Sequence, residues 1–471
     1  MTLKLFNSFG NKLEEFKPLK KGKVSLYTCG PTVYNYAHVG NFRAYAWEDI
    51  LRRYLEYKGF EVKHVMNFTD VDDKTIKGSS LEKIPLSLYT EKYKKAFLDD
   101  IKAINILPAS VYTPATEYIK EMVDLILVLL KKGVAYRGED GCIYFSIKKF
   151  PAYGKLAGID VKKLKEGARV KQDEYEKEGV GDFALWKAWD ENDGAVFWET
   201  PLGKGRPGWH IECSAMSMKQ FGPTIDIHTG GIDNKFPHHE NEIAQSEAAT
   251  GKKFVNYWMH CAHLMVNNQK MSKSLRNFYT LRDVLNKGCD ASAVRYVLIN
   301  SSYRQPINFT FESVEDAKKT LAGLNNFVER LRSIKQDLKT DSIDGIVALA
   351  KDGFDSSMDN DLNVPEAVKH IFDFVRKVNK LIDENAVGKN SASQAIGFLK
   401  KVNSVLAVID FSEKFFELTD EQRAKIVLRN TARKNKDWKK SDQLRDELKK
   451  DGIELKDNKD GSTTVNDSLV V

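Results

Sequence analysis

The chain lacks several features that define common protein classes. Its longest run of apolar side chains, residues 125–130, is far shorter than the roughly 18 residues that a membrane-spanning helix needs. The first residues show no basic, apolar and small-residue pattern of a secretion signal. We therefore expect a cytoplasmic protein with no membrane partner.

Cysteine is scarce, and several catalytic motifs are missing. Five cysteines, an odd number without regular spacing, favour thiols or metal ligands over disulfides. The sequence contains no GK[ST] pattern, no HExxH and no paired CxxC, so P-loop enzymes, metalloproteases and zinc ribbons are not indicated. A GxGxxG match occurs at residues 203–208, but Pro201 interrupts the approach to it, so dinucleotide binding is disfavoured.

Length and positive charge are what the chain has in quantity. Its 471 residues, 42% of them hydrophobic and 30% charged, suffice for roughly three domains. Residues 423–450 contain eleven Lys or Arg against four Asp or Glu, a net +7 that equals the formal charge of the whole chain. Such a stretch is typical of a nucleic-acid-binding face, with a solvated helix face as the alternative.

A strand, helix and strand are predicted near the N-terminus. Residues 23–28 and 60–68 have the character of strands, and residues 41–58 carry apolar side chains at helical spacing. This βαβ unit indicates an α/β protein with a parallel sheet. Further along, we expect a helix capped by Thr113 and Pro114, a hairpin over 134–147, a charged segment over 162–181, and a helical bundle over about 311–426.

A metal site is indicated by residues 237–242, which are predicted to open a helix. His238 and Glu242 are four residues apart and share one helix face, whereas His239 is expected to point elsewhere. Cys29 and Cys213 could add sulfur donors, which zinc accepts together with nitrogen and oxygen. The competing donors are His210, His228, Cys261 and His263, while Cys142 and Cys289 are expected to be small buried hydrophobes.

Two short segments suit a nucleotide. Residues 38–41, His-Val-Gly-Asn, lie where the loop after the first strand enters the first helix, and a helix N-terminus binds phosphate. Residues 270–274, Lys-Met-Ser-Lys-Ser, carry two lysines that could neutralise polyphosphate charge. A solvated turn is the alternative for the second segment.

The order of the segments along the chain carries a family resemblance. They are residues 27–34, 38–41, 67–74, 208–214, 236–242, 270–274, 293–296, 303–308 and 433–442. Together they resemble the cysteinyl-tRNA synthetase family. Asn41 departs from the family pattern by replacing the final His of the HIGH-type signature, and Thr229 stands where many relatives carry Gly.

The resemblance implies a class I Rossmann-like catalytic domain, whose parallel sheet is split by an inserted connective segment, followed by an α-helical bundle and a small C-terminal anticodon-binding domain. The expected divisions are the first catalytic half at 1–110, the insertion at 111–200, the second half at 201–265, the KMSKS loop and stem-contact region at 266–312, the bundle at 313–420 and the anticodon-binding module at 421–471.

Residue roles also follow from the resemblance. It places one Zn²⁺ per chain on Cys29, Cys213, His238 and Glu242. It assigns ATP binding and catalysis to His38, Asn41, Lys270 and Lys273, with Gly40 adding to the ATP site. Contacts with the substrate cysteine fall on Gly30, Thr69, Trp209 and His228, and anticodon contacts fall on Arg433, Trp438, Asp442 and Asp457.

The implied reaction joins L-cysteine to tRNA(Cys) through cysteinyl-adenylate, with ATP and Mg²⁺, in a monomeric enzyme. Zinc would select the thiolate, since shape alone separates cysteine from serine by only ~10²-fold. Two alternatives share the resemblance: a cysteine:amino-sugar ligase, which the basic C-terminus disfavours, and a non-catalytic RNA-binding relative, which the intact lysines and metal donors disfavour. A stand-alone zinc hydrolase would instead need an open metal site and no ATP.

Overall fold

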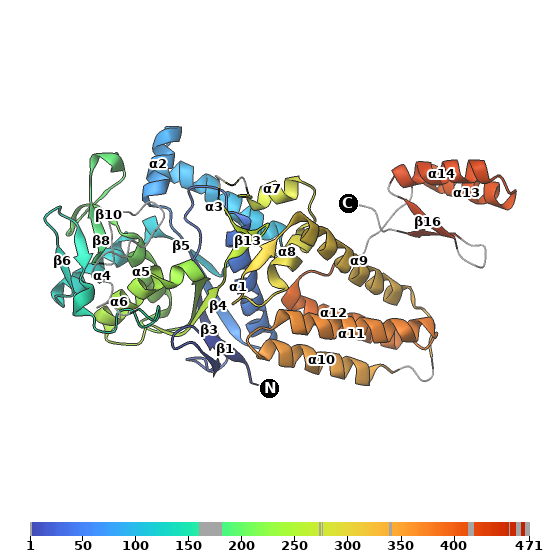
Figure 1. Cartoon of the computed structure of the whole chain (residues 1–471), viewed down its shortest axis with the longest axis horizontal. Coiled ribbons are helices and arrows are strands. Elements are labelled where there is room, and N and C mark those ends of the chain that lie inside the picture. The colour runs from blue at the N-terminus through green and yellow to red at the C-terminus, as the bar shows by residue number, and fades with distance from the viewer. Residues whose placement is uncertain are drawn as a thin grey trace. The chain divides into compact units, whose positions relative to one another are not determined.

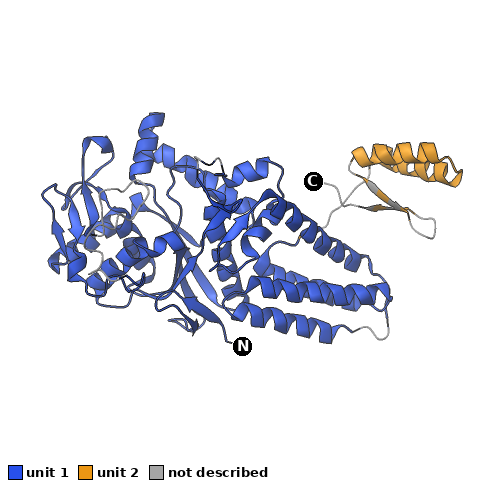
Figure 2. Cartoon of the chain, in the orientation of Figure 1, with its two compact units in different colours: residues 1–409 blue, residues 410–471 orange. Residues whose placement is uncertain are grey.

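The structure is a computed structural model that describes residues 2–159, 181–272, 275, 277–338, 342–412, 419–451, 453–457 and 463–466. It divides into two compact units, residues 1–409 and 410–471, shown in different colours in Figure 2. Apart from Gly181, the segment predicted over 162–181 lies outside the described residues. Within the described part of the chain, no helix is long and apolar enough to cross a membrane.

A five-stranded parallel sheet forms the centre of unit 1 (Figure 1). Its order is β12-β11-β3-β4-β5, and every neighbouring pair is parallel. The strands are β3 (Lys23–Thr28), β4 (Glu61–Phe68), β5 (Val111–Pro114), β11 (Ile225–Gly231) and β12 (Val255–Cys261). The predicted α/β class with a parallel sheet is therefore confirmed.

Helix α1 (Val39–Tyr57) connects β3 to β4 and completes the predicted βαβ unit. It begins two residues before the predicted start because His38 is its N-cap, and the side chains of His38 and Asn41 form a reciprocal capping box. Phe42, Tyr45 and Ile50 on its buried face pack into the core. The first turn of α1 is thus fixed at the carboxyl edge of the sheet.

A second sheet is inserted between β5 and β11, with antiparallel strands in the order β6-β7-β8-β10-β9. These strands are β6 (Ala135–Arg137), β7 (Ile143–Phe145), β8 (Phe183–Ala188), β9 (Trp198–Thr200) and β10 (Gly203–Pro207). The predicted hairpin over 134–147 is confirmed as β6 and β7. The GxGxxG match lies mostly in β10, an antiparallel strand, so it lacks the parallel βαβ setting of a dinucleotide site.

The predicted helix cap at Thr113 and Pro114 is wrong. Both residues belong to β5, which pairs with β4, and the following helix α4 (Ile119–Lys131) begins after Tyr118. Pairing with the central sheet outweighs the local capping signal. The central sheet consequently extends to Pro114, four residues into the insertion predicted over 111–200.

The remaining elements of unit 1 surround the sheet or continue from it. At the N-terminus are β1 (Lys4–Asn7) and β2 (Lys12–Glu15), and after β4 come α2 (Asp73–Glu82) and α3 (Leu86–Ala103). The second half adds α5 (Trp209–Phe221), α6 (His238–Thr250), β13 (Leu264–Val266), β14 (Gln269–Lys270), α7 (Leu281–Asn286), α8 (Ala291–Ile299) and β15 (Ile307–Phe309).

The predicted helical bundle is present in unit 1 as α9 (Phe311–Ser333), α10 (Asp344–Asp359), α11 (Val364–Asp383) and α12 (Lys389–Leu406). A buried arginine links the bundle to α1 and α8: Arg295 of α8 donates to Asp49 of α1 at 2.5 Å and to the Leu406 carbonyl of α12 at 2.7 Å. A buried charge with this many partners holds these helices in one arrangement.

Unit 2 is small, and its basic side chains are concentrated in residues 423–450. It consists of α13 (Asp420–Lys434), α14 (Trp438–Lys450) and the antiparallel pair β16 (Glu454–Asp457) and β17 (Thr463–Asn466). Leu448, Ile453 and Leu455 form its core.

Candidate active site

Four predicted metal donors come together at the carboxyl edge of the parallel sheet. Cys29 directly follows β3, Cys213 lies on α5, and His238 and Glu242 lie one turn apart on α6. One ligand atom from each lies within 4.8 Å of the others, and all four residues are buried. Residues far apart in the sequence thus present two sulfurs, one nitrogen and one oxygen to a common point.

A second set of donors overlaps the first. Cys29, His228, His239 and Glu242 also bring ligand atoms within 4.8 Å of one another. His239 Nε2 lies 3.3 Å from Cys29 Sγ, so the prediction that His239 points elsewhere is wrong. The error has a physical reason: the first turns of α6 are buried on every side, so side chains on more than one helix face reach the site.

Glu242 provides the observation that tests whether a cation fits. Its Oε2 lies 3.0 Å from His228 Nε2, but its Oε1 is buried and has no hydrogen-bond partner among the described residues. That Oε1 lies 3.2 Å from His238 Nε2. A buried carboxylate oxygen without a partner is costly, and a cation would satisfy it. Since zinc accepts sulfur, nitrogen and oxygen together, this donor set fits zinc.

Burial controls the protonation of these groups. It raises the pKa of the Cys29 thiol well above its usual range, and the adjacent Cys213 raises that pKa further. It also raises the pKa of Cys213 and lowers the pKa of His238 well below its usual range. The thiols are therefore protonated and the imidazole is neutral until a cation displaces the thiol protons.

Outer hydrogen bonds orient the histidines. His238 Nδ1 lies 2.9 Å from His210 Nδ1, and His239 Nδ1 lies 2.9 Å from His260 Nε2. His260 in turn lies 2.8 Å from Ser8 Oγ. Such partners fix the ring orientation of metal-binding histidines. His260 was missed by sequence analysis because an isolated strand histidine carries no spacing signal.

Two residues predicted to contact cysteine are connected to neighbours of the metal donors: Gly30 follows Cys29, and Thr69 bonds Glu212, which precedes Cys213. Gly30 N–H donates to Asn67 Oδ1 at 2.7 Å, and Thr69 Oγ1 donates to Glu212 Oε2 at 2.7 Å. A Cβ at Gly30 would lie 1.8 Å from the Asn67 carbonyl oxygen, so only glycine fits.

Two other predicted cysteine contacts lie against the donors themselves. The ring of Trp209 stacks on that of His238 with centroids 4.1 Å apart, and His228 bonds Glu242. Sequence analysis did not single out Asn67 and Glu212, although both lie within the segments that carry the family resemblance. They hold Gly30 and Thr69 in place.

The nucleotide segments also come together. His38 forms an antiparallel bridge with Thr280, and Val39 N–H donates to the Tyr279 carbonyl at 3.0 Å, which joins the start of α1 to the chain just after residues 270–274. Within that loop, Ser272 N–H donates to Asn277 Oδ1 at 2.8 Å. Lys270 is exposed at the end of β14, and Lys273 lies outside the described residues.

His38 is neutral at physiological pH. Burial lowers its pKa to about 4. Its Nδ1 accepts a hydrogen bond from Asn41 N–H at 3.2 Å, so the ring proton lies on Nε2. His38 can therefore donate a hydrogen bond from Nε2 to a phosphate oxygen, but it supplies no positive charge.

The four residues predicted to read an anticodon lie in unit 2. Trp438 begins α14 and is 58% exposed, and Asp442 is exposed one turn later. Asp457 lies 2.8 Å from Arg433, and its pKa is lowered to about 2, mainly by its bonds from Arg429. Arg433 and Asp457 thus already bond each other, whereas Trp438 presents its ring to solvent.

The other cysteines and histidines lie outside both donor sets. Cys261 is buried, with its Sγ directed at the Arg43 carbonyl, and His263 is exposed 3.3 Å from Asp233. The prediction that Cys142 and Cys289 are buried is wrong, because both are only half-buried.

The parallel-sheet fold and the two nucleotide segments, residues 38–41 and 270–274, define a class I tRNA synthetase catalytic domain. A family model described as "tRNA synthetases class I (C) catalytic domain" matches residues 15–319, and a DALR domain model matches residues 353–410. Mycobacterium tuberculosis methionyl-tRNA synthetase, solved with methionyl-adenylate, has a similar fold, with a TM-score of 0.59 at 14% identity over 82% of this chain and 90% of that chain.

Relatives that match nearly the whole chain identify the family within this class. The cysteine–tRNA ligase of Protochlamydia amoebophila is 50% identical over 98% of this chain and 97% of its own. That of Brachyspira hyodysenteriae is 48% identical over 97% and 98%, respectively. The chain belongs to the cysteine–tRNA ligase family of class I aminoacyl-tRNA synthetases.

Proposed function

We propose that this enzyme ligates L-cysteine to tRNA(Cys) in two steps, and that a zinc ion held by Cys29, Cys213, His238 and Glu242 selects the amino acid. In the first step the cysteine carboxylate attacks the α-phosphorus of ATP, giving cysteinyl-adenylate and releasing pyrophosphate. In the second, a terminal ribose hydroxyl of the tRNA, the 2′ position in this class, attacks the carbonyl carbon and releases AMP. The observation that carries the proposal is the convergence of these four donors beside the start of α1.

Catalysis of adenylate formation consists of positioning and charge stabilisation. The Gly40 N–H in the first turn of α1, the His38 Nε2–H and the side-chain Nδ2–H of Asn41 donate to phosphate oxygens, and Gly40 allows the phosphate close to the backbone. Lys270 and Lys273, with Mg²⁺, neutralise the charge that develops on pyrophosphate.

The zinc set that includes Cys213 and His238 is favoured over the set that includes His228 and His239. The unpartnered Glu242 Oε1 lies beside His238, whereas Oε2 already bonds His228. His239 Nε2 is likewise already engaged with Cys29. Zinc bound there would supply a soft cation that prefers a thiolate to a hydroxyl, and so would reject serine.

Substrate contacts follow from the same geometry. Gly30 follows Cys29 and is held by Asn67, and Thr69 is held by Glu212, the neighbour of Cys213. Trp209 and His228 lie against His238 and Glu242. We assign these four residues to binding of the amino acid. We propose that the enzyme acts as a monomer in the cytoplasm, with the predicted segments adjusted so that the first catalytic half extends through β5.

Binding of tRNA is assigned to unit 2. The excess of Lys and Arg over residues 423–450 attracts the phosphate backbone, and the exposed Trp438 ring offers a surface for base stacking. Arg433, Asp442 and Asp457 complete the proposed anticodon-reading set.

Three measurements on the purified chain test this function. We expect about one zinc per chain, ATP–pyrophosphate exchange that requires cysteine and ignores serine, and transfer of cysteine to tRNA(Cys). Exchange without transfer to tRNA would instead support a ligase that uses a small acceptor such as an amino-sugar. Absence of cysteine-dependent exchange would refute the proposal.

A further inference from the structure

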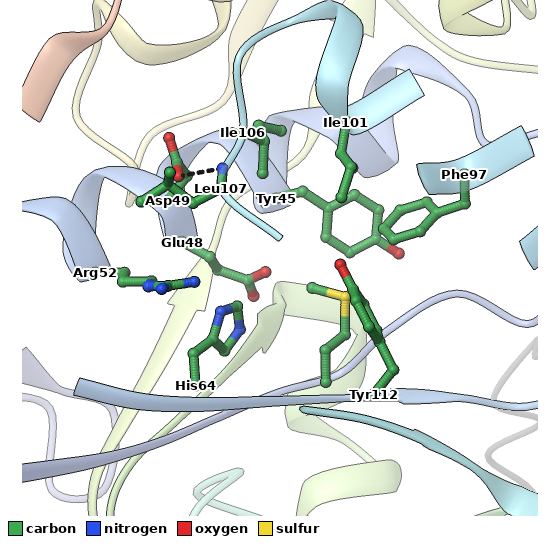
Figure 3. A pocket seen from close by; sticks show the side chains of 11 residues that line it. Tyr45, Glu48, Asp49, Arg52, His64, Phe97, Ile101, Ile106, Leu107 and Tyr112 are labelled. Carbon is green, nitrogen blue, oxygen red and sulfur yellow. Dashed lines mark hydrogen bonds between the residues drawn. The ribbon is translucent and has the colours of Figure 1, made fainter. Parts of the chain in front are cut away.

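A small cavity lies between α1, α3 and the parallel sheet (Figure 3). The space open to the centre of a water molecule is about 10 Å³, close to that of a single water. Its wall is mostly aromatic and aliphatic, and four polar or charged residues also line it: Glu48, Asp49, Arg52 and His64. The cavity belongs neither to the donor cluster nor to the nucleotide segments.

Two buried polar atoms at this cavity have no hydrogen-bond partner among the described residues: Glu48 Oε2 and His64 Nδ1. Glu48 is 1% exposed and His64 is 4% exposed. In Figure 3 the Glu48 carboxylate lies beside the His64 ring among the residues that line the cavity. Buried polar atoms are nearly always satisfied, and a site with room for one water and two such atoms is suited to hold it.

Burial favours the neutral form of both side chains. Burial raises the pKa of Glu48 to about 8, against a smaller opposing effect of its bond with Thr229. Burial lowers the pKa of His64 to about 3. A protonated Glu48 can donate from Oε2, and water can accept that hydrogen bond while it contacts the neutral imidazole.

Hydrogen bonds from the other polar atoms of Glu48 and His64 connect both residues to the backbone around Cys29. Thr229 Oγ1 donates to Glu48 Oε1 at 2.8 Å, and the Thr229 carbonyl accepts from Cys29 N–H at 3.2 Å. His64 Nε2 lies 2.9 Å from the hydroxyl of Thr28, which precedes Cys29 and pairs with Thr229 across β3 and β11. One network therefore holds both strands that flank Cys29.

We propose that one water molecule binds between Glu48 and His64, and that Glu48 is a positioning residue that holds Cys29 through Thr229 and Thr28. The positioning role rests on the proposed function, which makes Cys29 a zinc ligand. The geometry of the water site does not depend on the proposed function. An apolar side chain of similar size in place of Glu48 would fill the same space. It would leave the Thr229 hydroxyl without its acceptor and the proposed water at His64 without its second partner.

The test compares full-length variants that keep volume but differ in hydrogen bonding. Glu48→Gln retains an acceptor for Thr229 and a donor for water, whereas Glu48→Leu retains neither. Thr229→Val removes the hydroxyl from the other side of the same bond and serves if Glu48→Leu does not fold. Tyr54→Phe is the matched control: it removes a buried hydrogen bond to Asp359 from the same helix, at 2.8 Å, without touching the network.

Zinc affinity and the thiolate-to-metal absorption of the Co²⁺-substituted protein are the readouts, together with a high-resolution crystal structure of the wild type. We expect Glu48→Leu and Thr229→Val to weaken zinc binding about 10- to 100-fold, as for other residues that orient ligands, and to shift the absorption band. Glu48→Gln and Tyr54→Phe are expected to resemble the wild type. The crystal structure is expected to show a water within hydrogen-bonding distance of Glu48 Oε2 and His64 Nδ1.

Wild-type zinc affinity and spectrum in Glu48→Leu, or equal damage by Glu48→Gln and Glu48→Leu, would overturn the positioning role. A crystal structure without that water would overturn the water site. A wild-type protein that binds no zinc would overturn the proposed metal site and the positioning role together, whereas intact wild-type binding beside an unaffected Glu48→Leu variant overturns the positioning role alone.

Discussion

Met271 lies against Gly40, so closely that a Cβ at position 40 would be 2.5 Å from Met271 Cε. Gly40 belongs to the first turn of α1 and Met271 to the loop that follows β14. Two segments separated by more than two hundred residues thus meet at one helix N-terminus. A phosphate bound at that terminus would lie between the donors of α1 and the lysine beside Met271.

Replacing Lys270 by Ala is expected to slow cysteine-dependent pyrophosphate exchange by about 10²- to 10³-fold, since a positioned cation stabilises charge that develops in the transition state. The KM for cysteine should change little, because Lys270 lies outside the donor cluster. Lys219→Ala, which removes an exposed lysine paired with Glu121, is the control and should exchange at the wild-type rate. Equal effects of the two substitutions would argue against a role for Lys270.

The His38→Ala variant tests the protonation state of His38. Because burial lowers the pKa of His38 to about 4, the ring is neutral both at pH 6 and at pH 8. The exchange rate of His38→Ala, relative to the wild type, should therefore be reduced by the same factor at the two pH values. A reduction that grows as the pH falls from 8 to 6 would show that a protonated His38 contributes to catalysis.

The sequence was sufficient to predict features that depend on local pattern. The spacing of His238 and Glu242 placed two donors on one helix face, and the apolar periodicity between β3 and β4 predicted α1. Thr113 and His239 show where local pattern fails: strand pairing placed the first in β5, and burial of α6 on every side brought the second to Cys29.

Contacts between distant segments could not be predicted in the same way. Glu48 and Thr229 are 181 residues apart and meet only because α1 packs over β11. Nothing in the residues around Glu48 distinguishes it from an ordinary helix glutamate. By contrast, the convergence of Cys29 and Cys213 could be proposed because the family resemblance fixed their partners in advance.

Removal of a zinc donor should change amino-acid selection. Cys213→Ser replaces a buried sulfur donor by a harder hydroxyl, so we expect zinc content to fall from about one per chain to near zero. Discrimination between cysteine and serine should then fall toward the ~10²-fold that shape alone provides. Cys142→Ser, which changes a cysteine outside the cluster, should alter neither zinc content nor the ratio of serine to cysteine exchange. An unchanged ratio after loss of the metal would contradict selection by zinc.

Zinc affinity should depend steeply on pH. Burial raises the pKa values of Cys29 and Cys213 above their usual range, so both thiols carry protons at neutral pH in the metal-free protein. Zinc binds the thiolates, and each displaced proton makes the apparent affinity fall tenfold per unit decrease in pH. Competition with a chelator between pH 6.5 and 8.5 should therefore show affinity falling by up to about 100-fold per unit as the pH decreases. A flat profile would contradict two thiolate ligands.

Trp438 separates tRNA recognition from amino-acid activation. Its ring is 58% exposed at the start of α14, so its removal costs little packing. Trp438 belongs to unit 2, whereas the donor cluster belongs to unit 1. Base stacking on an exposed aromatic contributes about 1–3 kcal/mol per base, so Trp438→Ala should raise the KM for tRNA(Cys) roughly tenfold or more. Pyrophosphate exchange and the thermal unfolding temperature should stay at wild-type values, and Trp438→Phe, which keeps a stacking surface, should recover much of the charging. If Trp438→Ala lowered exchange and thermal stability together, the ring would serve folding, and recognition of tRNA would have to depend on the charged residues of unit 2.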